Sequence, residues 1–144
     1  SNTGDPVALA GSFFRVKGTY KAWSYTGLPS GSIILDEEVA ANPSDYLFKF
    51  EVNSASDYPF YDITSKTGGY LIKLNGGNYQ WKYSLDENMN TFGEWYTVTL
   101  ELENVATAGL VSGKIALTLA MQPNVEWNVD HSFANIRIEK KIGQ

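Results

Sequence analysis

The sequence predicts an all-β domain, an antiparallel β-sandwich of the jelly-roll type. Apolar and polar residues alternate with a period of two over most of the chain, and helical periodicity is almost absent. Turn residues interrupt this alternation at short intervals, so that about ten short strands are expected. The length of 144 residues suits one domain with one core. We favour a jelly roll over an immunoglobulin fold because two cysteines flanking a tryptophan are missing and ten strands exceed seven.

Three segments carry the clearest strand pattern, namely residues 46–53, 96–102 and 114–121. In each of them every second residue is apolar, which predicts one buried face and one solvated face. The residues expected to face the core are Tyr46, Phe48, Phe50, Val52, Tyr96, Val98, Leu100, Leu102, Ile115, Leu117, Leu119 and Met121. Shorter strands are expected at residues 13–17, 20–25, 33–35, 60–64, 70–74, 79–83 and 133–139.

One helical turn and one hairpin turn are also predicted. Residues 36–41 form the helical turn, with Asp36 as the N-cap and Pro43 ending it. Residues 75–78, Asn-Gly-Gly-Asn, join two strands, because glycine tolerates the positive φ that such a turn needs.

The charge balance argues against a polyanionic partner. The net charge is −5, with 11 basic and 16 acidic residues, and the basic residues are scattered. Nucleic-acid binders instead gather cations on one face. No nucleic-acid partner is therefore expected, and neutral partners fit the composition best.

The chain termini bear on the expected domain organisation, and the absence of cysteine bears on the chemistry that the chain can carry. Residues 1–10 are expected to be a linker or a remnant of excision, and residues 11–144 a single domain. The first residues lack the features of a signal peptide. The absence of cysteine excludes disulfides, thiol nucleophiles and zinc-cysteine sites, but is compatible with an exported protein.

The 20 aromatic residues are the main functional signal. Tyr79, Trp81 and Tyr83 stand at alternate positions, so in a strand they share one face. Trp23 and Tyr25 repeat this spacing, and Tyr58 follows a polar loop. Exposed aromatic rings can stack on the C–H face of a sugar ring, and Tyr and Trp also hydrogen-bond sugar hydroxyls. Further hydrogen bonds are expected from Asn78, Gln80, Lys82, Asn88 and Asn90.

The competing interpretation is that these rings fill the core, as most large aromatic residues do. Phe14, Tyr46, Phe48, Phe50, Tyr96 and Phe133 are expected to be core residues. Trp95 is also more easily explained as core, although it is out of phase with its strand. Trp127 stands among polar residues in an expected loop, so its burial is less secure.

Catalysis and cofactors find little support in the sequence. His131 follows Asp130, but no Gly-x-Ser-x-Gly nucleophile elbow accompanies this pair. A glycosidase needs two carboxylates at a defined separation, and the sequence does not show which acidic residues lie at that distance from each other. No metal ligands and no cofactor are predicted, although a structural calcium ion remains an alternative.

Several segments in order resemble a known family. They are residues 11–18 (GSFFRVKG), 22–25 (AWSY), 42–53 (NPSDYLFKFEVN), 77–81 (GNYQW), 93–100 (GEWYTVTL) and 133–138 (FANIRI). Together they resemble the C-terminal glycan-binding domain of Bacteroidetes surface glycan-binding proteins, the group typified by xyloglucan binders. The match covers nearly the whole chain, and the ordered series is more specific than any one motif.

The resemblance implies a non-catalytic β-sandwich at the far end of an outer-membrane lipoprotein. Such a domain captures a polysaccharide for a neighbouring importer and contacts the membrane only through the lipid anchor of the whole protein. The positions that match the family's aromatic platform are Trp23, Tyr25, Tyr79 and Trp81. The function expected from the sequence is binding of a neutral polysaccharide, a β-glucan or a hemicellulose such as xyloglucan. The alternatives are a structural or protein-interaction module and a small glycoside hydrolase.

Overall fold

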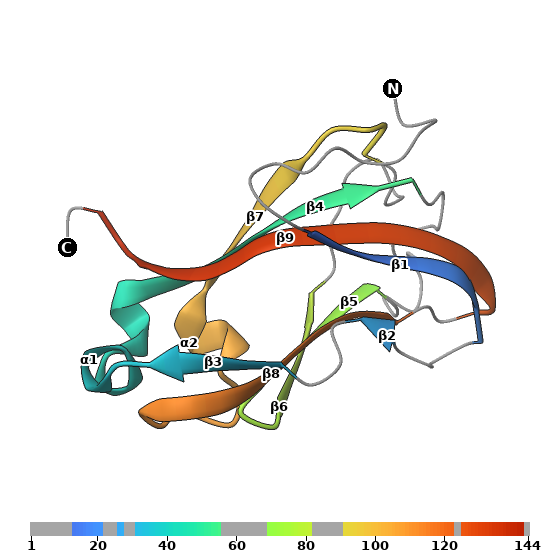
Figure 1. The fold of residues 1–144 in the computed structure, drawn as a ribbon. Coiled ribbons are helices and arrows are strands. Elements are labelled where there is room, and N and C mark those ends of the chain that lie inside the picture. The colour runs from blue at the N-terminus through green and yellow to red at the C-terminus, as the bar shows by residue number, and fades with distance from the viewer. Residues whose placement is uncertain are drawn as a thin grey trace.

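The structure is a computed structural model, and it describes residues 13–21, 26–27, 31–55, 69–81, 91–122 and 125–142. Two antiparallel sheets make up the domain (Figure 1). The first, sheet A, has the order β1-β9-β4-β7, and the second, sheet B, has the order β2-β8-β5-β6 with β3 also paired to β8. The strands are β1 (Phe13–Tyr20), β2 (Thr26–Gly27), β3 (Gly31–Leu35), β4 (Tyr46–Ser54), β5 (Gly69–Leu74), β6 (Gly77–Trp81), β7 (Tyr96–Glu101), β8 (Gly113–Gln122) and β9 (Trp127–Lys140).

The all-β sandwich predicted from the sequence is confirmed. The chain passes repeatedly between the sheets, because β1, β4, β7 and β9 belong to sheet A while the strands between them belong to sheet B. This alternation is consistent with the expected jelly roll, and the jelly-roll assignment itself stays a prediction. The expected strand at residues 60–64 lies outside the described residues.

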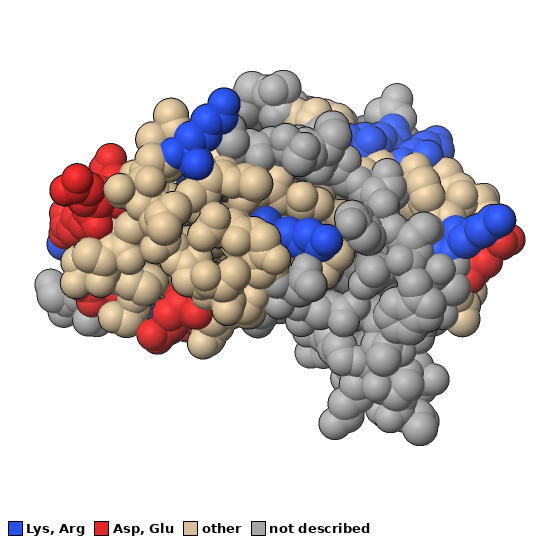
Figure 2. Space-filling view, turned by 90° about the horizontal axis from the view of Figure 1, so that it is seen from below, with Lys and Arg blue, Asp and Glu red and all other residues tan. Residues whose placement is uncertain are grey.

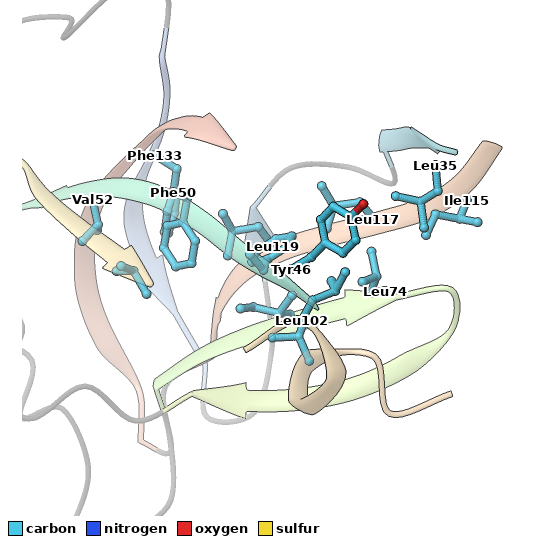
Figure 3. Close-up of a cluster of buried hydrophobic side chains, with 14 of the residues drawn as sticks. Leu35, Tyr46, Phe50, Val52, Leu74, Leu102, Ile115, Leu117, Leu119 and Phe133 are labelled. Atoms are coloured by element: carbon cyan, nitrogen blue, oxygen red, sulfur yellow. The ribbon is translucent and has the colours of Figure 1, made fainter. Parts of the chain in front are cut away.

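The core lies between the inner faces of the two sheets (Figure 3). Sheet A contributes aromatic rings, of which Phe48, Phe50 and Phe133 are fully buried. Sheet B contributes aliphatic side chains, such as the fully buried Ile72 and Leu119. Burial of one such side chain stabilises the fold by about 1.5–3 kcal/mol. The period-two pattern of β4 and β8 therefore identified the inner face correctly from Tyr46 to Val52 and from Ile115 to Leu119.

A bulge lets the long strand β9 keep its apolar residues inside. The register between β4 and β9 shifts between Lys49 and Glu51, and Asn135 opposite this region has a φ of 54°. An extra residue in one strand reverses the side on which later residues fall. As a result Phe133 before the bulge and Ile138 after it both pack with the core.

Two short helices follow strands of the sandwich. Helix α1 (Glu37–Ala41) has Asp36 at its N-cap position and ends before Pro43, as the sequence predicted, and a 3₁₀ turn (Pro43–Asp45) follows it. Helix α2 (Leu102–Val105) was not predicted, because Leu102 continues the alternation of β7. Leu102 and Val105 are both fully buried and three residues apart, which is the spacing of a helical turn.

Three aromatic residues differ from their expected places. Tyr96 is 38% exposed, because it opens β7, which is an edge strand of sheet A. Trp127 does not lie in a loop: it is the first residue of β9 and packs against the core. Trp95 is half-buried and outside the core, where its ring meets Phe13 edge-to-face at 5.7 Å. The side chain of Phe14 lies outside the described part of the structure.

Gly77 sits where the hairpin of β5 and β6 touches the segment after α2. A Cβ atom at this position would lie 2.7 Å from the backbone nitrogen of Ala108 and would also collide with Oγ1 of Thr107. Backbone cannot move aside as a flexible side chain can, so only glycine fits this approach.

We expect Gly77→Ala to lower the free energy of unfolding by about 1–3 kcal/mol, because the added methyl group overpacks the contact with Ala108. Urea denaturation measures the change. Ala116→Gly, on the exposed outer face of β8, is the control and should cost about 1 kcal/mol or less. A Gly77→Ala variant as stable as the parent would contradict the close approach.

His131 is buried on the inner face of sheet A, between the core residues Val129 and Phe133 of β9. Its side chain is fully buried and its ring is stacked on Phe133 with centroids 6.5 Å apart. Burial lowers the pKa of His131 from 6.5 to about 3, against a smaller opposing effect of the Asp130 charge. The imidazole is therefore neutral in the folded protein at physiological pH.

This lowered pKa predicts a loss of stability in mild acid. The unfolded chain takes up a proton near pH 6.5 while the folded chain does not, so the free energy of unfolding falls as the pH drops from 7.5 to 5. The loss is about 2 kcal/mol over this range. His131 is the single histidine of the chain, so His131→Gln should remove most of the slope in urea titrations at the two pH values. An unchanged slope in this variant would contradict the assignment.

Candidate functional site

The strands are aligned so that many of their ends meet at one end of the sandwich (Figure 1). Tyr20 at the end of β1 pairs with Trp127 at the start of β9. In sheet B, Tyr70 pairs with both Met121 near the end of β8 and Trp81 at the end of β6. We call this the open end, and define it by the strand-terminal residues Tyr20, Thr26, Ser54, Gly69, Trp81, Tyr96, Gln122 and Trp127. The helices α1 and α2 and the turn Asn75-Gly76 lie at the opposite end.

The predicted platform residues are linked to the open end by the chain. Tyr79 and Trp81 belong to β6, which finishes there. Trp23, Tyr25, Tyr58 and Tyr83 lie outside the described residues, as do Lys82, Asn88 and Asn90. The segments that contain them are nonetheless flanked by described strands whose ends lie at the open end, namely β1 and β2, β4 and β5, and β6 and β7.

The register of β6 bears on the role of its two aromatic residues. Tyr79 is the partner of Ile72, and Trp81 is the partner of Tyr70. Partners in an antiparallel pair fall on the same face of the sheet, and Ile72 is fully buried in the core. Positions 79 and 81 thus belong to the row that faces the other sheet, and position 81 lies where that row reaches the open end. Positions 78 and 80 belong to the outward row, with Lys73 and Leu71 as partners.

One turn at the open end is held firmly to the end of β4. The amide of Thr91 donates to the carbonyl oxygen of Ser54 at 2.8 Å, and the amide of Ser54 donates to Oγ1 of Thr91 at 2.9 Å. The side-chain amide of Asn53 donates to the carbonyl oxygen of Gly93 at 3.1 Å. All three anchoring residues, Asn53, Ser54 and Thr91, are buried. The turn is therefore fixed in position by hydrogen bonds from buried or partly buried groups.

This turn presents an aromatic residue that the sequence did not single out. The amide of Glu94 donates to the carbonyl oxygen of Thr91 at 3.1 Å, which closes the turn around Phe92 and Gly93. Phe92 is 62% exposed and has a φ of 54°. Phe92 is not flanked by alternating apolar and polar residues, so the period-two pattern does not indicate it. The only signal in the sequence is the glycine that follows it.

The charges of sheet A are arranged as pairs on its outer face. Arg137 Nη1 lies 2.8 Å from the buried carboxylate of Glu51 and its Nε lies 2.6 Å from Glu139. Burial opposes the charge on Arg137, but the hydrogen bonds to the two carboxylates outweigh it and raise its pKa. Lys49 also binds Glu139 at 2.9 Å and, with Arg137, lowers the pKa of that carboxyl group. These ion pairs compensate the charges on this face, including the buried charge of Glu51.

Sheet B has a different outer surface, on which the described residues carry few charges. Figure 2 views the molecule from this side, and uncharged residues cover most of the described surface. The outward row of β8 includes the exposed Ala116 and the half-buried Thr118.

A cleft of about 290 Å³ lies away from the open end, between β3, α1 and the second half of β9, and is lined mostly by apolar residues such as Ile33, Val39 and Ile136.

The described residues do not assemble a metal centre. None of them forms a group of three or more His, Cys, Asp or Glu side chains placed to hold a metal ion. His131 is fully buried and neutral, so it does not meet a substrate at the surface. Within the described part of the chain, no helix is long and apolar enough to cross a membrane.

Comparison with known proteins agrees with this architecture. The family model of the surface glycan-binding protein B xyloglucan binding domain matches residues 1–140. The chain belongs to this family. The family that the sequence resembled is thus confirmed, and the chain is a member of a family of cell-surface, glycan-binding domains. No curated protein matches the chain significantly.

Two solved structures share the fold of this xyloglucan-binding-domain family member. SGBP-B from a complex xyloglucan utilization locus in Bacteroides uniformis has 19% sequence identity and a TM-score of 0.56, over 96% of this chain and 44% of that protein. A crystal structure of a fragment described as domains CD has 16% identity and a TM-score of 0.51, over 92% of this chain and 55% of that one. The chain thus spans about half of each structure, and identities this low show the fold alone.

The anchoring of the Thr91–Glu94 turn yields a prediction about stability. Thr91→Val keeps the size of the side chain but removes the acceptor of the buried Ser54 amide. We expect the free energy of unfolding to fall by about 1–3 kcal/mol, which is the cost of an unsatisfied buried donor. Thr99→Val, at an exposed position of β7, is the control and should change it by less than about 0.5 kcal/mol. Equal effects of the two substitutions in chemical denaturation would contradict the anchoring.

Proposed function

We propose that this domain binds a neutral polysaccharide, a β-glucan or a hemicellulose such as xyloglucan, by stacking sugar rings on aromatic side chains at the open end. The observation that carries the proposal is that the three aromatic-bearing segments are all flanked by strand ends at this end. Membership in the xyloglucan-binding-domain family supports the choice of ligand. The site residues proposed are Trp23, Tyr25, Tyr58, Tyr79, Trp81 and Tyr83.

The chemistry of such a site needs neither a cofactor nor a catalytic base. The C–H face of a pyranose ring packs on an aromatic face, and neighbouring polar groups hydrogen-bond the hydroxyls. In a neutral glycan no charge has to be compensated. An open surface excludes little water and has to order a flexible chain, so we expect dissociation constants of about 1 μM or weaker.

We propose that, in the whole protein, the domain captures the polysaccharide. It would hold the polysaccharide at the outer membrane, to which the full-length protein is attached as a lipoprotein, ahead of a neighbouring importer complex. Binding without cleavage suits this role, and we propose that the domain is not an enzyme. The family description as a surface glycan-binding protein supports this placement.

The register of β6 bears on the alternative function, a structural module. Positions 79 and 81 belong to the row that faces the other sheet. Trp81 can therefore contact a glycan only where the two sheets separate beside it, and without such a separation it packs in the core. A structural module would use its rings only for packing. Oligosaccharide added to the protein changes tryptophan emission if the rings form the site, and leaves it unchanged if they are packed away.

The decisive test is retardation on affinity gels that contain a panel of polysaccharides. The parent should be retarded by its cognate glycan, and Trp81→Ala and Trp23→Ala should abolish retardation while thermal unfolding remains cooperative. Ile34→Ala, which removes a side chain that is 78% exposed near α1, is the control and should bind as the parent does. Unfolding of Trp81→Ala would assign Trp81 to the core. Reducing ends released from the panel would favour a hydrolase.

A further inference from the structure

The turn around Phe92 and Gly93 has the backbone of a type I′ turn. Both central residues have positive φ, 54° for Phe92 and 85° for Gly93. Type I′ turns favour Asn-Gly, because asparagine and glycine tolerate this left-handed conformation. A bulky aromatic residue there is an outlier and costs free energy.

The same chain contains a second turn of nearly identical geometry with the favourable residues. Asn75 and Gly76 join β5 to β6 with φ values of 53° and 84°. This turn lies at the opposite end of the sandwich, among the helices. The two turns differ mainly in their first central residue, which is asparagine near the helices and phenylalanine at the open end.

Strained conformations persist where the surrounding structure enforces them, and they gather at functional sites. The hydrogen bonds of Asn53, Ser54 and Thr91 enforce this one. The result is a large apolar ring, 62% exposed, on a fixed stem at the end where β1, β4 and β6 finish. An aromatic ring held in this way offers contact area at a small entropic cost on binding.

We propose that Phe92 is a further glycan-binding residue, whose ring packs against the C–H face of a sugar unit of the bound polysaccharide. This proposal rests on the proposed function and extends its site to a residue of sheet A. Phenylalanine has no hydrogen-bonding group, so its contribution is apolar and independent of the hydroxyl pattern of the sugar. The ring therefore strengthens binding along the glycan chain without selecting one linkage.

The test exchanges the residues of the two turns. In Phe92→Asn the open end acquires the favourable residue and loses the ring, so we expect the melting temperature to rise by about 2–4 °C. The same variant should bind a xyloglucan oligosaccharide at least about fivefold more weakly in calorimetric titrations. Phe92→Tyr should bind within about twofold of the parent, because it keeps the ring. Asn75→Phe is the mirrored control, and it should lower the melting temperature and leave the affinity unchanged.

The possible results separate the two proposals. Weaker binding by Phe92→Asn with equal or higher stability supports the role of Phe92. Binding equal to the parent, with retardation lost in Trp81→Ala, would overturn the role of Phe92 and leave the proposed function standing. Lower stability together with weaker binding would show that the ring serves packing, and would also overturn it. A parent protein that binds no glycan of the panel would overturn both proposals.

Discussion

The packing of the aromatic inner face of sheet A on the aliphatic inner face of sheet B is the interaction on which the rest of the structure depends. Phe48, Phe50 and Phe133 are withdrawn from water by Ile72 and Leu119 across the sandwich. The side-chain period of a strand is two, so this burial fixes the register of every strand that takes part, because a slip by one residue would expose the whole row. The bulge beside Asn135 satisfies the same constraint in the longest strand.

A fixed register also determines where the strands stop, and this connects the core with the site. Once β4, β8 and β9 are aligned by their buried rows, their ends at Ser54, Gln122 and Trp127 fall at one end of the domain. The segments with Trp23, Tyr25, Tyr58 and Tyr83 follow β1, β4 and β6, whose last residues Tyr20, Ser54 and Trp81 belong to the same end. The core thus supplies the base from which these connections leave, and binding residues are commonly found on such connections. The turn at Phe92 illustrates the division, since its stem is buried and its ring is exposed.

The sequence was most informative where one face of a strand is buried and the other is solvated. The alternation in residues 46–53 and 114–121 predicted their strands and their inner faces, and Asp36 and Pro43 marked the short helix. Leu102 kept the phase of β7 but begins a helix, because a fully buried residue fits a strand and a helical turn equally well. Trp127 was misplaced because its neighbours are polar, whereas its own position in β9 faces the core.

For the site, spacing identified rings that share a face but not which face, because only long-range pairing, such as that of Tyr79 with Ile72, fixes the direction. The exposed position of Phe92 has no signal in the sequence pattern, because it depends on backbone conformation and on hydrogen bonds to β4, and neither has a periodic signature.

We propose that a neutral glycan binds at the open end. The measurement that tests it most directly is the change in backbone amide NMR signals when a xyloglucan oligosaccharide is added to the isotope-labelled domain. We expect the largest shifts at Tyr20, Gly69, Trp127 and the turn from Thr91 to Glu94, with little change in α1. Shifts concentrated around α1, or on the charged outer face near Arg137 and Glu139, would contradict it.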